Sequence, residues 1–296
     1  MTHGALLHHV SSLLDREGPA QSAFAHAPSG LHFLRFCKPT GQDATVYRPL
    51  LCLVLQGAKE VGTSKGTLRI ADGQSLVVSH ALPVVSRISE ATPDRPYIAL
   101  VFPIDFDLLR SLAVNVAPAR APVHLDPFSI SLWQTDLEMK EALLRHLRHC
   151  ECEDTRRLLA PITAREIHAR LLLGPHGEPL RKLLWHETTA SRIFKATREI
   201  QSNLARPLVV GHLADRTGMS SSAFFEHFKA VTGTSPLQYQ KDLRLLRARE
   251  ALRSTNGKVS EIAFEVGYES SAQFSREYAR KFGMPPRQDR SVHAVE

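Results

Sequence analysis

Short apolar runs alternate with turn-forming residues between positions 31 and 103. Each run is about six residues long and rich in Val, Leu and Ile, and Gly, Pro or Asp separates most of the runs. Such runs are typical of β-strands, and six closely spaced strands predict a small barrel or sandwich. The runs are Leu31–Cys37, Leu50–Gln56, Gly66–Ala71, Gln74–Ser79, Leu82–Ile88 and Tyr97–Pro103.

After Pro103 the apolar residues recur at helical spacing, with an interruption at Gly174-Pro175-His176-Gly177. The helices expected from this spacing are Phe106–Leu112, Leu132–Cys150, Arg156–Leu173, Glu178–Trp185 and Ala190–Leu204. We place a domain boundary near residue 188. The sequence thus predicts an α+β chain, with a β-barrel and its following helices over residues 1–188 and an all-α domain over residues 189–296.

The last third of the chain contains an approximate repeat. In each copy a small residue, Ala214 or Ala263, is followed four residues later by a glycine, Gly218 or Gly267. This is the pattern of a helix-turn-helix, in which two helices cross closely and the chain then reverses at a residue with positive φ. A pair of aromatic residues four apart then marks the buried face of the second helix. These pairs are Phe224 with Phe228, and Phe274 with Tyr278.

The positive charge of the chain is concentrated in the same region. Residues 191–296 contain 17 Lys and Arg against 11 Asp and Glu, whereas residues 1–190 contain 20 against 19. A basic domain attached to a nearly neutral one indicates a polyanionic partner, most often nucleic acid. Two helix-turn-helix copies in register within the basic part indicate binding to double-stranded DNA.

The stretch from Phe228 to Lys241, and Ile262–Tyr268 with Phe274-Ser-Arg276 and Phe282-Gly283, resemble the double helix-turn-helix domain of the AraC/XylS family of bacterial transcription regulators. Leu51-Cys-Leu-Val-Leu-Gln-Gly57 resembles the cupin-like domain of one branch of that family. The resemblance implies a linker helix over about 236–254 that holds two recognition helices one DNA turn apart. It also implies a regulator whose barrel responds to a small organic effector.

Base contacts are expected from the exposed face of each recognition helix. By donor and acceptor geometry Gln273 can pair with adenine and Arg276 with guanine, while Glu226 can accept from cytosine or form a surface salt bridge. Arg276 has the alternatives of a phosphate contact or a salt bridge to Glu277 or Glu269. The expected base-contact residues are Ser222, Phe225, Glu226, Ser271, Ala272, Gln273, Ser275 and Arg276. The expected phosphate contacts are Ser221, Lys229, Ser270, Arg280 and Lys281, the basic ones having a solvated surface as the alternative.

Two regions of the sequence bear on metal binding, and neither predicts a metal site. His146, His149, Cys150 and Cys152 are ligand types that zinc prefers, but a solvated, charged loop explains them more simply. The region around His80 lacks the His-x-His pair of metal-binding cupins. No metal, cofactor or enzymatic activity is therefore expected. A cupin-type metal enzyme with an appended DNA-binding domain, and a constitutive DNA-binding protein whose barrel only dimerises, remain the alternatives.

Further partners and the location follow from weaker signals. Leu137, Leu144 and Leu147 suggest an apolar face that forms a homodimer through residues 130–173, or that covers the barrel. RNA polymerase is a further candidate partner. The sequence contains no apolar run of about 18 residues and no secretory signal pattern, so a cytoplasmic protein is expected.

Overall fold

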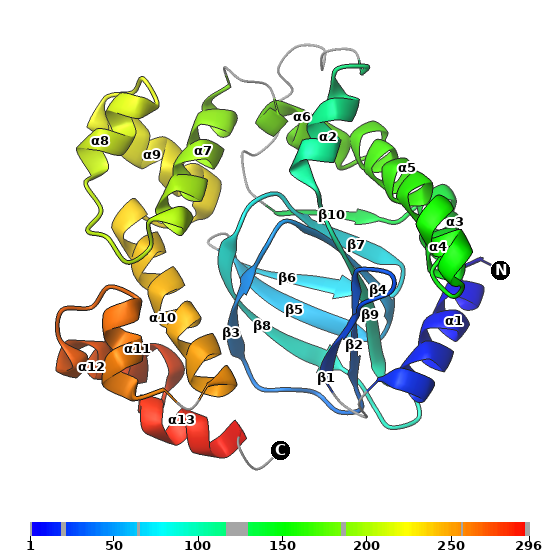
Figure 1. Cartoon of the computed structure of the whole chain (residues 1–296), viewed down its shortest axis with the longest axis horizontal. Coiled ribbons are helices and arrows are strands. Elements are labelled where there is room, and N and C mark those ends of the chain that lie inside the picture. Colours follow the sequence, from blue (N-terminus) through cyan, green and yellow to red (C-terminus); the bar gives the residue numbers. More distant parts are fainter. Residues whose placement is uncertain are drawn as a thin grey trace. The chain divides into compact units, whose positions relative to one another are not determined.

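The computed structural model describes residues 2–18, 22–63, 66–116, 130–184, 188–255 and 257–293 (Figure 1). The chain forms two compact units. The first contains Met1–Asp43 and Tyr47–Ser191, and the second contains Ala44–Val46 and Arg192–Glu296. Along the chain the units therefore divide after Ser191, where sequence reasoning expects a boundary near residue 188.

Within the described residues, the strands of the first unit form two antiparallel sheets. The six-stranded sheet has the order β1-β2-β9-β4-β7-β10, and the four-stranded sheet has the order β3-β8-β5-β6. Both sheets have free edges, so the fold is a cupin-like pair of sheets and not a closed barrel. The strands are β1 Ser22–His26, β2 Leu31–Phe36, β3 Asp43–Tyr47, β4 Leu50–Gln56, β5 Ala58–Thr63, β6 Gly66–Ala71, β7 Gln74–Val78, β8 Leu82–Glu90, β9 Tyr97–Pro103 and β10 Ile130–Gln134.

All six predicted strands are confirmed, as β2, β4 and β6 to β9. One prediction was wrong: the expected helix Leu132–Cys150 begins only at Leu137, because Leu132 belongs to β10, which pairs with β7. Likewise the expected helix Arg156–Leu173 is divided into α4 and α5 around Leu159. The expected helix Glu178–Trp185 corresponds to α6, and its last residue, Trp185, lies outside the described residues. The helices of this unit are α1 Thr2–Glu17, α2 Phe106–Ala113, α3 Leu137–His149, α4 Glu153–Leu158, α5 Ala160–Leu173 and α6 Gly177–Leu184.

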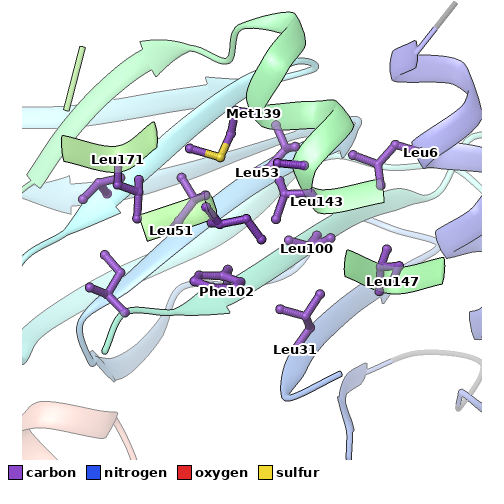
Figure 2. Close-up of a cluster of buried hydrophobic side chains, with 14 of the residues drawn as sticks. Leu6, Leu31, Leu51, Leu53, Leu100, Phe102, Met139, Leu143, Leu147 and Leu171 are labelled. Carbon is purple, nitrogen blue, oxygen red and sulfur yellow. The ribbon is translucent and has the colours of Figure 1, made fainter. Parts of the chain in front are cut away.

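The central strands of the larger sheet are apolar on both faces. In β4, Leu51 and Leu53 face one cluster of buried side chains while Cys52 and Val54 face another, because successive side chains of a strand point to opposite faces. The first cluster contains Leu100 and other side chains of the sheet together with residues of α1, α3 and α5 (Figure 2). The second fills the space between the two sheets. The larger sheet thus separates a helix-covered core from a sheet-covered core.

The leucines of α3 belong to the helix-covered core. Leu144 and Leu147 are buried there with Leu143, and Leu137 alone of the three predicted dimer residues is exposed. These leucines therefore cover the sheet, which is the alternative that their spacing left open. Sequence reasoning missed α1, although its buried residues Leu6, Val10, Leu13 and Leu14 follow the helical spacing.

The described helices of the second unit are α7 Thr189–Ser202, α8 Val210–Arg216, α9 Ser221–Thr232, α10 Pro236–Ser254, α11 Val259–Glu265, α12 Ser271–Phe282 and α13 Pro286–His293. They pack around two apolar cores, one with α7 to α9 and one with α11 and α12. The long helix α10 runs from one group to the other (Figure 1). None of the helices in the described part of the chain is both long and apolar enough to cross a membrane.

Candidate nucleic-acid interface

Helices α8 and α9 form a helix-turn-helix. The turn contains Gly218, whose φ is +65°, and the N–H of Met219 donates back to the carbonyl of Ala214 at 3.0 Å. Ser220 then caps α9, because its side chain accepts a hydrogen bond from the N–H of Ala223 at 3.3 Å. Phe224 and Phe228 are fully buried and pack beside Ala214 in the first core. One face of α9 is thereby fixed against the unit, and the opposite face is left exposed.

Helices α11 and α12 repeat this geometry. Gly267 has a φ of +93°, the N–H of Tyr268 donates to the carbonyl of Ala263 at 3.0 Å, and Ser270 caps α12 through the N–H of Gln273. Phe274 and Tyr278 are fully buried, as their counterparts are in α9. The one residue inserted in the second copy, Glu269, lies between the turn and the cap. Both second helices contain 12 residues and end at a glycine in the left-handed conformation.

Helix α10 has the bounds that sequence reasoning expected for the linker. Tyr239 and Leu243, in its first half, belong to the core around α9, whereas Leu245, Ala248 and Leu252 belong to the core around α12. One continuous helix therefore contributes to both cores. This arrangement fixes the two helix-turn-helix copies relative to each other.

Arg244 of α10 is a structural residue that sequence reasoning missed. Its guanidinium donates to the carbonyls of Leu204, Arg206 and Gly267, at 2.8 to 2.9 Å. Burial lowers the pKa of Arg244. The hydrogen bond to the carbonyl of Gly267 holds the second turn against α10. No sequence motif marked this residue, because its three acceptors are backbone carbonyls distant in the chain.

The predicted base-contact residues lie on the free faces of the two second helices. Ser222, Phe225 and Glu226 of α9 are exposed. In α12, Ala272, Gln273 and Arg276 are exposed, whereas Ser271 and Ser275 are half-buried. The Ser275 hydroxyl donates to the carbonyl of Ser271 at 2.9 Å, which leaves it less available to a base.

Arg276 and Gln273 differ in their surroundings. Arg276 forms no ion pair with any of the described residues, so the alternative pairing with Glu277 or Glu269 is not present. The amide of Gln273 donates to Glu277 at 3.3 Å. Arg276 is therefore free to reach a partner outside the chain, whereas Gln273 is oriented from within it.

Glu277 is the hub of a small polar network beside the recognition helix α12. Its carboxylate accepts from Lys241 Nζ at 2.9 Å and from the Tyr268 hydroxyl at 2.8 Å, in addition to Gln273. Burial alone raises the pKa of Glu277, but these three donors lower it below its ordinary value. The carboxylate is thus ionised at neutral pH and connects α12 to α10.

The candidate phosphate contacts are not equivalent. Lys229 and Arg280 are exposed, and neither forms an ion pair among the residues that the structure describes. Lys281 is half-buried, and its ammonium is paired with Asp242 of α10. Ser221 is exposed, and Ser270 is exposed but already serves as the cap of α12.

A buried carboxylate holds the last helix in place. Asp289 of α13 is fully buried and accepts from Arg249 Nε at 2.8 Å, Arg253 Nη2 at 3.0 Å and the Tyr278 hydroxyl at 2.7 Å. Burial alone raises the pKa of Asp289, but the three donors lower it. The guanidinium of Arg249 also lies 4.5 Å from the centroid of the Phe282 ring. Asp289 therefore ties α13 to both α10 and α12.

The suspected metal ligands do not form a site. Both ring nitrogens of His146 have protein partners: Nδ1 lies 3.0 Å from the Thr163 hydroxyl and Nε2 lies 3.1 Å from the Ser29 carbonyl. Among the described residues no group of His, Cys, Asp and Glu could hold a metal ion. His80 is buried, and burial lowers its pKa to about 3.

Comparison with known proteins identifies both halves of the chain. Residues 27–179 match the family described as the AraC-type transcriptional regulator N-terminus, and residues 213–291 match a helix-turn-helix domain. Among curated proteins, the chain is 28% identical over 167 residues to the HTH-type transcriptional activator RhaS of Escherichia coli strain K12 / DH10B. That match covers 56% of this chain and 59% of the relative. RhaS of Escherichia fergusonii is 29% identical over 161 residues, which cover 54% of this chain and 57% of the relative.

Solved structures with the same fold include ToxT of Vibrio cholerae. ToxT of strain SCE256 with a bound unsaturated fatty acid has a TM-score of 0.57 at 10% identity and covers 88% of this chain and 93% of its own. ToxT of strain O395 bound to (E)-4-(8-methylnaphthalen-1-yl)but-3-enoic acid has a TM-score of 0.59, also at 10% identity. The match covers 89% of this chain and 98% of the ToxT chain. The family match extends over more than half of the chain. The protein therefore belongs to the AraC/XylS family of transcriptional regulators, in the branch with an AraC-type N-terminal domain.

Proposed function

We propose that this protein regulates transcription by binding a specific site on double-stranded DNA with both of its helix-turn-helix copies. The observation that carries the proposal is the sharing of α10 by the two cores, which makes α9 and α12 parts of one rigid element. Two recognition helices held about 34 Å apart enter successive major grooves on one face of the DNA. A single chain can then read an asymmetric site.

Sequence is read by the free faces of the recognition helices. Arg276 donates two hydrogen bonds to a guanine, and its exposure and lack of an ion pair among the described residues support this role. Gln273, held by Glu277, reads an adenine. On α9 the reading residues are Ser222, Phe225 and Glu226. Lys229 and Arg280 contact phosphates, and the pairing of Lys281 with Asp242 gives Lys281 a smaller share of those contacts.

Residues 1–188 form the effector and dimerisation domain, and residues 189–296 form the DNA-binding domain. The effector is a small organic molecule. The fatty acid and the butenoic acid held by the two ToxT structures support this role for a domain of the same fold. The protein acts in the cytoplasm, where bacterial DNA is accessible to it.

Two further partners complete the proposal. The relatives of this chain are named transcriptional activators, which supports a contact with RNA polymerase. Homodimers form through residues 130–173. The exposed side chains of Leu158, Leu159 and Ile162, around the start of α5, support this interface, and the buried Leu144 and Leu147 do not contribute to it.

Selection from a pool of random DNA tests the proposal. The full-length protein should enrich a sequence with two half-sites about 10 base pairs apart. Arg276→Ala should relax the preference at one base pair and weaken the selected site by about 10- to 100-fold, because a bidentate contact contributes about 1–3 kcal/mol of discrimination. The matched variant Arg280→Ala should weaken all sequences alike. Failure of the full-length protein to enrich any sequence would refute the proposal.

A further inference from the structure

The two recognition helices correspond residue by residue, which allows their exposed side chains to be compared. Each begins after a capping serine, Ser220 in α9 and Ser270 in α12, whose side chain accepts a hydrogen bond from the N–H three residues later. In each helix the fourth residue after that serine, Phe224 or Phe274, is fully buried. Residues at the same distance from the cap therefore occupy equivalent places on the two helices.

The equivalent places carry different chemistry. The sixth residue after the cap is Glu226 in α9 and Arg276 in α12, and both are exposed. Glu226 forms no ion pair with any residue that the structure describes, so the surface salt bridge that its sequence allows is not present there. The third residue after the cap is Ala223 in α9, where α12 has Gln273. The two side chains of α12 that read purines in the proposed function thus have no counterpart at the same places of α9.

Phe225 is a second difference between the two helices. It is the fifth residue after the cap, and its counterpart Ser275 is half-buried and donates to a carbonyl of its own helix. The side chain of Phe225 is 45% exposed. A single exposed aromatic ring is common on protein surfaces and by itself indicates no site. This ring, however, adjoins Glu226 on the part of α9 that the buried Phe224 and Phe228 leave uncovered, which is the part that the proposed function places in the major groove.

A carboxylate and a phenyl ring select different features of the bases. An ionised carboxylate only accepts hydrogen bonds, and cytosine presents the donor N4 amino group in the major groove. Guanine and thymine present acceptors there, which repel a carboxylate that already lies beside negative phosphates. Adenine presents a donor next to an acceptor, which suits an amide side chain better. A phenyl ring forms none of these hydrogen bonds, but it packs against the C5 methyl group that distinguishes thymine.

We propose that α9 reads pyrimidines, with Glu226 accepting from N4 of a cytosine and Phe225 packing against the methyl group of a thymine in the same half-site. Because α12 reads purines, the two half-sites differ in kind and the chain binds its site in one orientation. Glu226 acts largely by exclusion, since its charge faces acceptors when guanine or thymine replaces the cytosine. This inference rests on the proposed function and specifies the bases that the first helix-turn-helix copy recognises.

Replacement of thymine by uracil in the DNA tests the role of Phe225 without changing the protein. Each thymine of the selected site is replaced in turn by deoxyuridine, which removes only the methyl group. At one position the full-length wild type should bind about fourfold more weakly, which is the effect of leaving one methyl group unburied. Phe225→Ala should bind the thymine and uracil versions of that position alike. The matched variant Phe264→Ala, which removes an exposed phenyl ring from α11, should keep the fourfold difference.

Exchange of the charge on α9 tests the role of Glu226. Glu226→Arg gives α9 the side chain that α12 has at the equivalent place, so DNA selection should change one base pair from cytosine to guanine on the same strand. That base pair should lie in the half-site that contains the uracil-sensitive thymine. Glu226→Ala should bind sites with guanine or thymine at this position about tenfold more tightly than the wild type does. The control Glu265→Ala, which removes an exposed carboxylate from α11, should leave the selected motif unchanged.

Three results would overturn the inference. They are the absence of any thymine at which uracil weakens binding, a Phe225→Ala variant that keeps every such sensitivity, and a Glu226→Arg variant that enriches the wild-type motif. Each of them still leaves an enriched DNA sequence with two half-sites. The proposed function fails only when the full-length protein enriches no sequence, so the two failures are distinguishable.

Discussion

Gly218 and Gly267 occupy the same position in the two turns but have different surroundings. Both have a positive φ, at which an L-residue with a side chain is strained by about 1–2 kcal/mol. A Cβ on Gly218 would meet only the guanidinium of Arg192, at 3.6 Å, which is an ordinary van der Waals contact. A Cβ on Gly267 would lie 2.7 Å from the Cα of Ala205 and closer still to its carbonyl oxygen, so the backbone there would have to move.

These distances predict unequal effects of one substitution. Gly218→Ala should lower the unfolding free energy by about 1–2 kcal/mol, which is the backbone strain alone. Gly267→Ala should lower it by about 2–5 kcal/mol, because an overpacking cost of about 1–3 kcal/mol is added to the strain. It should also weaken DNA binding, since Arg244 donates to the carbonyl of Gly267.

Urea denaturation of the full-length variants, followed by circular dichroism, measures both effects. Calorimetry then assigns the change to a unit, because only the transition of the helical unit should shift. Equal losses for the two alanine variants, or a larger loss for Gly218→Ala, would refute the argument that the backbone of Ala205 sets the difference.

Four further predictions concern the same helical unit. Asp289→Asn should lower its unfolding free energy by about 1.5–3 kcal/mol, because the partly exposed guanidinium groups of Arg249 and Arg253 lose their hydrogen bonds to a charged, buried carboxylate. The exposed control Glu250→Gln should change it by less than about 1 kcal/mol, and equal losses in urea denaturation would contradict this assignment. Neighbouring donors lower the pKa of Asp289 in the folded protein below its value in the unfolded chain, which is about 3.9. The stability that ionised Asp289 contributes is therefore fully present above about pH 3.9 and is lost as the pH falls through the lower pKa of the folded protein. Urea denaturation at a series of pH values below 7 should therefore show that the unfolding free energies of wild type and Asp289→Asn approach each other. A difference that stays constant with pH would contradict the titration of Asp289. Glu277→Gln should reduce discrimination at the base pair read by Gln273 without changing the salt dependence, as measured by DNA selection; an unchanged motif would show that Glu277 does not orient Gln273. The logarithm of wild-type DNA affinity should fall with the logarithm of salt concentration with a slope of about −4 to −5 for about five phosphate contacts. Arg280→Ala should reduce that slope by about one and Lys281→Ala by less, because Lys281 is paired with Asp242; the opposite ranking would contradict the assignment.

Sequence patterns predicted the elements in which apolar residues occupy the buried positions. The strands β4, β6 and β9 have the bounds that the apolar runs indicated, because their inward positions are apolar and turn residues mark their ends. The helix α10 has the bounds that the family resemblance implied. The strand β5 was missed. Its inward positions hold Lys59 and Val61, and a lysine in an inward position conceals the apolar alternation on which a strand prediction depends.

The groups that support the site could not be predicted from the sequence. Asp289 accepts a hydrogen bond from Arg249, which is 40 residues away in the sequence, and Arg244 donates one to the carbonyl of Gly267, which is 23 residues away. The local spacing of apolar residues does not predict such pairs, because tertiary packing and not helical periodicity brings the two residues together. The exposed faces of α9 and α12 were predictable because the buried aromatic pairs, such as Phe274 and Tyr278, determine which side of the helix is covered.

Interference of purine methylation with binding tests the central claim most directly. The full-length protein is bound to its selected site, and the DNA is methylated at guanine N7 in the major groove before binding. Two helices joined by α10 predict two patches of interference, centred about 10 base pairs apart on one face of the DNA. Arg276→Ala should remove interference at one guanine of one patch and leave the other patch unchanged. A single patch, or two patches on opposite faces, would contradict the claim that both helix-turn-helix copies of one chain read the DNA.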